Sequence, residues 1–148
     1  MSPNISTGLR TTFLVHMIIA AVLGIALLII PGRTLTLLGW VPRTFEVPQT
    51  ELTAPGTTFV DPVISRVLGA ALLALAVSSF QGWRARKWDE VALLVQLELA
   101  FSILGFIAIL GGWFNMDRAM PVIGWVLMLT LIVFAAAWGL AWQRQNVA

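Results

Sequence analysis

The sequence predicts an all-α integral membrane protein, an antiparallel bundle of four transmembrane helices in a single domain over residues 1–148. Of the 148 residues, 59% are hydrophobic and 11% are charged. The mean hydropathy of +0.91 is far above that of a soluble domain. The apolar residues lie in four runs, each close to the roughly 20 residues that a helix needs to cross a bilayer.

The composition argues against several classes of protein. Cysteine is absent, so the chain has no disulfide framework, thiolate nucleophile or iron–sulfur ligand. Nine Lys and Arg stand against seven Asp and Glu, and the cations are spread along the chain instead of forming the basic face that nucleic-acid binding needs. The sequence has no Gly-rich phosphate loop or His-Glu-x-x-His motif, and its one histidine lies inside an apolar run. We therefore expect neither a nucleic-acid partner nor an enzyme.

The first helix is expected over residues 11–30, and Pro31-Gly32 ends it. A cleaved signal peptide is the alternative, but its apolar region has only about 7 to 15 residues and is followed by small residues at a cleavage site. Here Pro-Gly-Arg follows a longer run, so we expect a retained transmembrane helix.

Residues 32–61 form a long connection that is interrupted by several prolines. Residues 34–40 have the composition of a short interfacial helix, and residues 43–47 and 57–60 alternate in the manner of a small hairpin. Two interpretations remain open for this loop: a lid or partner-docking surface, and a plain connector.

The other three helices are expected over residues 62–81, 89–113 and 120–142. Asp61-Pro62 is a favourable start for the second helix, because Asp caps free N–H groups and Pro is tolerated in the first turn. The turn that leads to the third helix places three cations between two tryptophans: Trp83, Arg84, Arg86, Lys87 and Trp88.

The distribution of Lys and Arg predicts the orientation in the membrane, since short cytoplasmic loops carry an excess of these residues. The side of the two termini holds five cations, and the other side holds three: Arg10, Arg84, Arg86, Lys87 and Arg144 against Arg33, Arg43 and Arg118. We therefore expect a multi-pass protein of the bacterial inner (plasma) membrane, with both termini in the cytoplasm and loop 32–61 outside. The seven tryptophans are expected to anchor the helices at the two interfaces.

Small and polar residues recur every four positions and predict the packing faces of the helices, because close approach and interhelical hydrogen bonds hold helices together in lipid. These series are Thr12, His16, Ala20 and Gly24 on the first helix; Arg66, Ala70, Ala74 and Ser78 on the second; Glu98, Ser102, Gly105, Ile109 and Gly112 on the third; and Ala135 and Gly139 on the fourth.

Three ionisable residues lie inside the apolar runs, where burial is costly and function is the usual reason for it: His16, Arg66 and Glu98. At about 1.5 Å per residue, His16 and Glu98 lie roughly 9 and 12 Å inside the cytoplasmic ends of their helices. Ser78 and Gln96 fall within about one turn of the same level. The sequence thus predicts a buried polar cluster of His16, Ser78, Gln96 and Glu98.

Arg66 is expected to play a different part, at the outer interface. Its position is about 12 Å from Glu98 along the membrane normal, which is too far for an ion pair. We expect its side chain to extend outward, toward Asp61 or the long loop.

Three interpretations of the polar cluster remain open. Glu98 can be neutral or hydrogen-bonded and simply tie helices together, since removal from water disfavours a charged carboxyl. The cluster can relay protons or a substrate, as in small transporters. His16 can bind a haem or a chlorophyll-type pigment, because a neutral imidazole on a helix can ligate a metal centre. No other cofactor and no bound metal are expected.

The order of the parts resembles a known group of proteins. A first helix that closes in Pro31-Gly32, a long outer loop, and Arg66-Val-Leu-Gly-Ala at the start of the second helix are similar to the small four-helix bacterial membrane proteins of unassigned function around the DoxX-like families. The resemblance implies a fold and a topology, and it supplies no catalytic residues.

Because packing faces are many and reactive groups few, we expect a non-enzymatic accessory or structural subunit of a larger membrane assembly. Its partners would be the lipid bilayer and either other membrane subunits or further copies of the chain. A small-solute or proton-coupled transporter that works as an oligomer through Glu98 is the first alternative. A pigment- or haem-bearing subunit is the second.

Overall fold

The computed structural model describes residues 4–46, 52–115 and 119–146. Within these residues the fold is all-α, with four long helices that pack against one another: α1 (Thr7–Ile29), α3 (Pro62–Arg84), α4 (Ala92–Phe114) and α5 (Val122–Asn146). Each is long and apolar enough to cross a membrane. The chain is therefore a multi-pass integral membrane protein, and the predicted four-helix architecture is confirmed.

The first helix begins and ends at local signals. The Ser6 side chain caps α1 by accepting a hydrogen bond from the Leu9 amide, at 3.2 Å. At the other end, Pro31 opens a short helix, α2 (Pro31–Leu37), without an intervening loop. The Thr34 hydroxyl lies 3.0 and 2.9 Å from the carbonyls of Ala26 and Ile30, which also accept the amides of Ile30 and Thr34. Its single proton is thus shared between two carbonyls where α1 passes into α2. The short interfacial helix that we expected over residues 34–40 thus starts three residues earlier.

The loop carries the predicted hairpin with one strand displaced. Strand β1 (Thr44–Glu46) lies within the expected segment and pairs antiparallel with β2 (Thr53–Pro55), whereas residues 57–60 were expected to form the second strand. The chain leaves the ladder at Gly56, whose amide donates to the Arg43 carbonyl at 2.9 Å and whose Cα packs on Pro42 with no room for a Cβ. A 3₁₀ turn, η1 (Gly56–Phe59), follows.

The second long helix starts where the sequence predicts. The carboxylate of Asp61 accepts hydrogen bonds from the amides of Val63 and Ile64, at 2.8 and 3.1 Å. The helix runs to Arg84, one turn further than expected, and the basic turn then includes a short 3₁₀ element, η2 (Trp88–Glu90). The third long helix consequently begins at Ala92 instead of residue 89.

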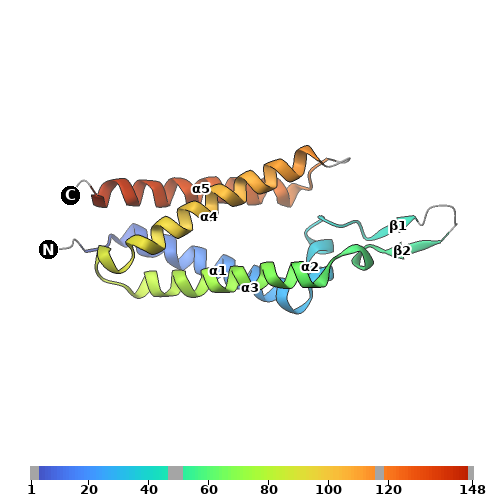
Figure 1. The fold of residues 1–148 in the computed structure, drawn as a ribbon, viewed down its shortest axis with the longest axis horizontal. Coiled ribbons are helices and arrows are strands. Elements are labelled where there is room, and N and C mark those ends of the chain that lie inside the picture. Colours follow the sequence, from blue (N-terminus) through green and yellow to red (C-terminus); the bar gives the residue numbers. More distant parts are fainter. Residues whose placement is uncertain (1–3, 47–51, 116–118, 147–148) are drawn as a thin grey trace.

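The long helices form two antiparallel pairs, α1 with α3 and α4 with α5 (Figure 1). Glycines allow α1 and α3 to touch: a Cβ at Gly69 would lie 2.8 Å from the Gly24 carbonyl oxygen, and one at Gly82 would overlap the Phe13 ring. The second pair is joined by contacts such as that between the rings of Trp113 and Trp125, whose centroids are 5.0 Å apart.

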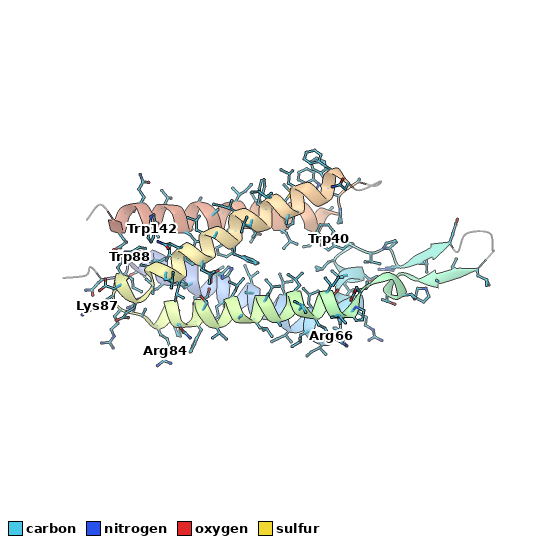
Figure 2. All side chains as sticks on the ribbon, in the orientation of Figure 1. Trp40, Arg66, Arg84, Lys87, Trp88 and Trp142 are labelled. Atoms are coloured by element: carbon cyan, nitrogen blue, oxygen red, sulfur yellow. The ribbon has the colours of Figure 1, made fainter. Side chains whose placement is uncertain are left out.

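Both ends of the chain lie at one end of the molecule, together with the basic turn, while the hairpin lies at the opposite end (Figure 1). Side chains mark the two ends, with Lys87, Trp88 and Trp142 near the termini and Trp40 and Arg66 at the other end (Figure 2). The Ile5 amide donates to the Arg86 carbonyl at 3.1 Å, so the N-terminal segment is attached to the basic turn.

The two pairs pack together mainly at the end that holds the termini. The hydrophobic core there is formed by the N-terminal segment, α1, the basic turn, α4 and α5: Ile5, Leu9, Phe13, Trp88, Val91, Val95, Phe134 and Trp138. From this core α4 runs away from α3 (Figure 1). The buried residues of α4 are Val95, Glu98 and Ser102, so burial along this helix ends before its midpoint.

Candidate functional site

A buried triad of polar side chains lies where the helix pairs meet. His16 comes from α1, Ser79 from α3 and Glu98 from α4, and their side chains are joined in a row. The His16 Nδ1 is 2.8 Å from the Ser79 Oγ, and that Oγ is 3.0 Å from the Glu98 Oε1. The three residues are 6%, 0% and 0% exposed, so the row is closed off on all sides.

The hydrogen bonds of the triad can run in either of two directions. The Ser79 hydroxyl donates to Glu98 Oε1. A hydroxyl has one proton, so its oxygen then accepts from an N–H at His16 Nδ1. The opposite order, in which a protonated Glu98 donates to Ser79 and Ser79 donates to Nδ1, fits the same distances. The serine therefore links the imidazole to the carboxyl by a path along which a proton can pass.

The fourth long helix supplies an aromatic wall to the triad. The His16 ring meets Phe134 edge to face, with centroids 4.8 Å apart, and Trp138 lies 6.1 Å away at a similar angle. Phe13 packs on Trp138 at 4.8 Å. Trp138 is fully buried, so its place is in the core and not at the interface where we expected every tryptophan. All four long helices thus contribute side chains at the level of the triad.

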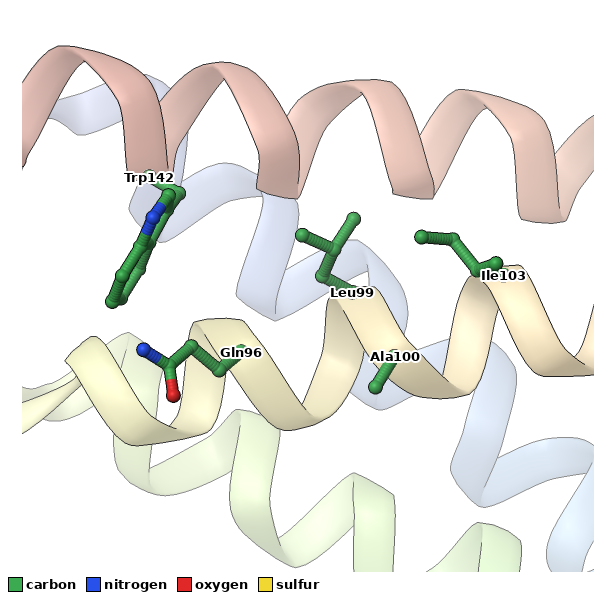
Figure 3. Close-up of a pocket in the computed structure, with 5 residues that line it drawn as sticks. All are labelled: Gln96, Leu99, Ala100, Ile103 and Trp142. Atoms are coloured by element: carbon green, nitrogen blue, oxygen red, sulfur yellow. The ribbon is translucent and has the colours of Figure 1, made fainter.

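The structure brings His16 and Glu98 of the predicted cluster together and places the Ser78 hydroxyl near the Glu98 carboxyl. His16 and Glu98 lie level, with Nδ1 and Oε2 3.4 Å apart. The Ser78 hydroxyl is buried beside that carboxyl, and its neighbour Ser79 forms the bridge between Glu98 and His16. Gln96 is exposed on another face of α4, in a groove beside Trp142 (Figure 3).

Ser79 was missed because the packing face of α3 differs by one position from the predicted one. Arg66, Ala70 and Ala74 are exposed. The buried residues of α3 are Ser65, Gly69, Leu75, Ala76, Ser79 and Gly82. Small residues also recur in this second series, so the sequence contains two competing small-residue patterns on α3, one of which includes Ser79.

Arg66 and Asp61 lie at the other end of the bundle, away from the triad. The exposed Arg66 guanidinium donates from Nε to the Leu28 carbonyl at the end of α1, at 3.3 Å. Asp61 uses its carboxylate to cap α3. The structure therefore places Arg66 at the end of the bundle that carries the hairpin, and its hydrogen-bond partner is the Leu28 carbonyl of α1 instead of the expected Asp61 or long loop.

The arrangement differs from that of a hydrolytic triad. In such a triad the imidazole bridges the nucleophile and the carboxylate through its two different nitrogens. Here both Ser79 and Glu98 face the same nitrogen, Nδ1, and the serine has no exposed surface. The triad can hold or pass a proton and can tie three helices together.

A metal site of the common kind is not formed by the residues that the structure describes. Among them, no group of three or more His, Asp or Glu residues could hold an ion. A haem or pigment ligand at His16 stays a prediction, which an absorption spectrum of the gently purified protein would test.

Comparisons of the chain with protein-family models, with curated proteins and with solved structures find no match. The resemblance to the DoxX-like families therefore stays a prediction. What the structure shows of the chain is a four-helix integral membrane protein with a closed His–Ser–Glu triad at the meeting point of its helices.

Proposed function

We propose that the protein is a non-enzymatic subunit of a larger membrane assembly, and that the triad fastens its two helix pairs at one end. One observation carries this proposal: the four long helices meet around the triad, and α3 and α4 diverge beyond it (Figure 1). At the other end, the loop residues Gly39 and Trp40 lie against Pro121 and Gly124 at the start of α5. The diverging surfaces of α3 and α4 are what remains available to a partner helix.

The divergent faces are the surfaces that α3 and α4 would turn toward such a partner. They consist of Ile64 and Leu68 on α3, and Ile109 and Gly112 on α4. Leu68 lies seven residues, or nearly two turns, before the buried Leu75, and Ile109 lies seven residues after the buried Ser102, so both continue the faces that pack at the joint.

Three of these four positions are exposed, and Ile109 is half-buried. Ile64 and Leu68 are 69% and 47% exposed, and a Cβ at Gly112 would have no described atom within 4 Å. Small residues on transmembrane helices allow a second helix to approach closely, and interhelical packing is the main force that joins helices in lipid. These properties support a transmembrane helix of another subunit as the occupant.

The proposed orientation has both termini in the cytoplasm of a bacterial cell and the hairpin outside the plasma membrane. Both termini and the basic turn lie at the same end of the described structure (Figure 1). The excess of Lys and Arg on that side supports a cytoplasmic placement.

Site-specific photo-crosslinking in native membranes tests the proposal. A crosslinking residue at Leu68 or Gly112 should capture one partner of defined mass. The same residue at the nearby positions Ala70, two residues after Leu68, or Gly111, next to Gly112, should not, because these positions are exposed on other faces of the same helices. Native mass spectrometry should find the same partner in a fixed ratio. A lone monomer, or equal capture from all four positions, would overturn the proposal.

A proton-coupled transporter is the second candidate, and the hydrogen-bonded row of the triad favours it. The row connects two groups that bind protons through a hydroxyl, at 2.8 and 3.0 Å, inside the membrane. In vesicles with a pH gradient and an internal pH dye, Glu98→Gln should abolish proton flux. The control Glu90→Gln, in the turn outside the membrane, should retain it. Unchanged flux in Glu98→Gln would count against a relay.

A further inference from the structure

A second groove, distinct from the triad, lies between the start of α1 and the end of α5. It has a volume of about 270 Å³. Its lining changes in character along its length. Ser6, Arg144 and Gln145 line the end next to the termini, and Leu9, Ala137 and Leu140 are among the residues that line the deeper part. Thr12 also lines the deeper part, and its hydroxyl is bonded to the Gly8 carbonyl at 3.1 Å. A groove with a cation at one end and mainly apolar side chains farther in has a place for both the headgroup and an acyl chain of a phospholipid.

Arg144 gives the groove its charge preference. Its side chain is exposed, and no carboxylate among the described residues lies within ion-pair distance of it. The guanidinium of Arg10, by contrast, is already bonded to the Ala85 carbonyl at 3.0 Å. Gln145 adds a buried amide oxygen that has no hydrogen-bond partner in the described structure. The polar end thus offers a cation for the phosphate and an amide oxygen that can accept a hydrogen bond from a headgroup hydroxyl.

We propose that this groove binds an anionic phospholipid of the leaflet on the side of the termini, with the phosphate at Arg144 and one acyl chain along Leu9, Ala137 and Leu140. Basic pockets between transmembrane helices are a recurrent type of site for anionic headgroups. A free phosphate would leave the apolar lining uncovered, which favours the lipid. The site is independent of the triad and of the proposed partner helix.

Native mass spectrometry of the full chain with added lipid tests the site. The probes are phosphatidylglycerol and phosphatidylcholine with the same acyl chains. The wild type should retain the anionic lipid in preference to the zwitterionic one. Arg144→Gln should weaken phosphatidylglycerol binding about fivefold, the effect of one cation near the membrane surface. Ala137→Phe should fill the groove and remove binding of both lipids.

Two matched variants serve as controls. Arg84→Gln removes a cation at the same end of the bundle but outside the groove, and Ala136→Phe adds the same ring at the adjacent exposed position of α5. Both should bind phosphatidylglycerol as the wild type does. A far-UV circular dichroism spectrum checks that each variant is folded. If Ala137→Phe does not fold, Arg144→Gln still tests the site.

Four results would overturn the proposal. The first is equal binding of the two lipids by the wild type, and the second is equal weakening by Arg144→Gln and Arg84→Gln, which would reflect surface charge alone. The third is displacement of the lipid by glycerol phosphate at equal concentration, which would indicate a site for a free anion. The fourth is a protein dimer that Ala137→Phe dissociates, which would make a second copy the occupant.

Discussion

At the scale of single residues, Ser79 is the connection between the imidazole and the carboxyl. Its hydroxyl contacts groups on two other helices, and all three side chains are buried. Ser79→Ala would leave the His16 Nδ1 and the Glu98 Oε1 without these partners, in surroundings where water cannot replace them. We predict a loss of about 1–2 kcal/mol in the free energy of unfolding, measured by denaturation in mixed detergent micelles.

Ser102→Ala is the matched control for this prediction. Ser102 is as deeply buried as Ser79, but its hydroxyl bonds the Glu98 carbonyl one turn earlier in its own helix, at 2.8 Å. Its loss should change the free energy of unfolding by no more than about 0.5 kcal/mol. Equal effects of the two substitutions would show that the hydroxyl of Ser79 does not join helices.

The sequence was sufficient to predict how deep the triad residues lie along their helices, but not toward which neighbouring helix each side chain points. Rise per residue is fixed in a helix, so counting inward from the ends of the apolar runs placed His16 and Glu98 at one level. The direction of each side chain depends on how its helix is rotated about its axis, which tertiary packing decides. Contacts of Gly69 and Gly82 with α1 place the Ser79 hydroxyl between His16 and Glu98. Gln96 likewise lies at the predicted depth, but its side chain is on another face of α4.

At the scale of elements, the contact between α1 and α3 depends on two glycines that face each other. A Cβ at Gly69 would lie 2.8 Å from both the Gly24 carbonyl oxygen and the Leu28 amide nitrogen. These are backbone atoms, so the helices would have to separate. We predict that Gly69→Ala costs about 1–3 kcal/mol in the free energy of unfolding, by the same micelle denaturation.

Gly111→Ala is the control for the helix contact, because a Cβ there would meet no described atom within 4 Å. Alanine has a higher helix propensity than glycine, so this variant should be neutral or gain up to about 1 kcal/mol. If Gly69→Ala were equally well tolerated, the close crossing of α1 and α3 would be disproved.

Local signals in the sequence were sufficient for the helices and insufficient for the hairpin. Asp61-Pro62 starts α3 because the cap and the proline act within one turn. The second strand was placed too late, since an alternating pattern over residues 57–60 carries no information about which strand it would pair with. Its true position depends on Gly56, which packs on Pro42 and ends the ladder.

At the scale of the whole molecule, the orientation in the membrane can be tested simply because the chain has no cysteine. Thr53→Cys in β2 and Gln143→Cys near the end of α5 would each provide one exposed thiol, at opposite ends of the bundle. With termini in the cytoplasm, a membrane-impermeant maleimide should label Thr53→Cys in intact cells and Gln143→Cys only after permeabilisation. The reverse pattern would invert the orientation.

The divergence of the helix pairs could not be predicted from the sequence. Four apolar runs of similar length predict four spanning helices but leave the angle between pairs open, since lipid solvates an apolar surface as well as a neighbouring helix does. The angle depends on the volumes of the side chains at the joint, such as Phe13, Phe134 and Trp138. In the structure, α3 and α4 are joined at the triad and separate beyond it (Figure 1).

Distances between pairs of spin labels on α3 and α4, measured by pulsed electron paramagnetic resonance in lipid nanodiscs, test this separation most directly. Three pairs of exposed positions, each seven residues from the next on both helices, keep the labels on the same faces: 77 with 97, 70 with 104, and 63 with 111. We predict that the distance increases from the first pair to the third. Equal distances at the three levels would show that α3 and α4 stay side by side along their whole length and do not separate beyond the triad.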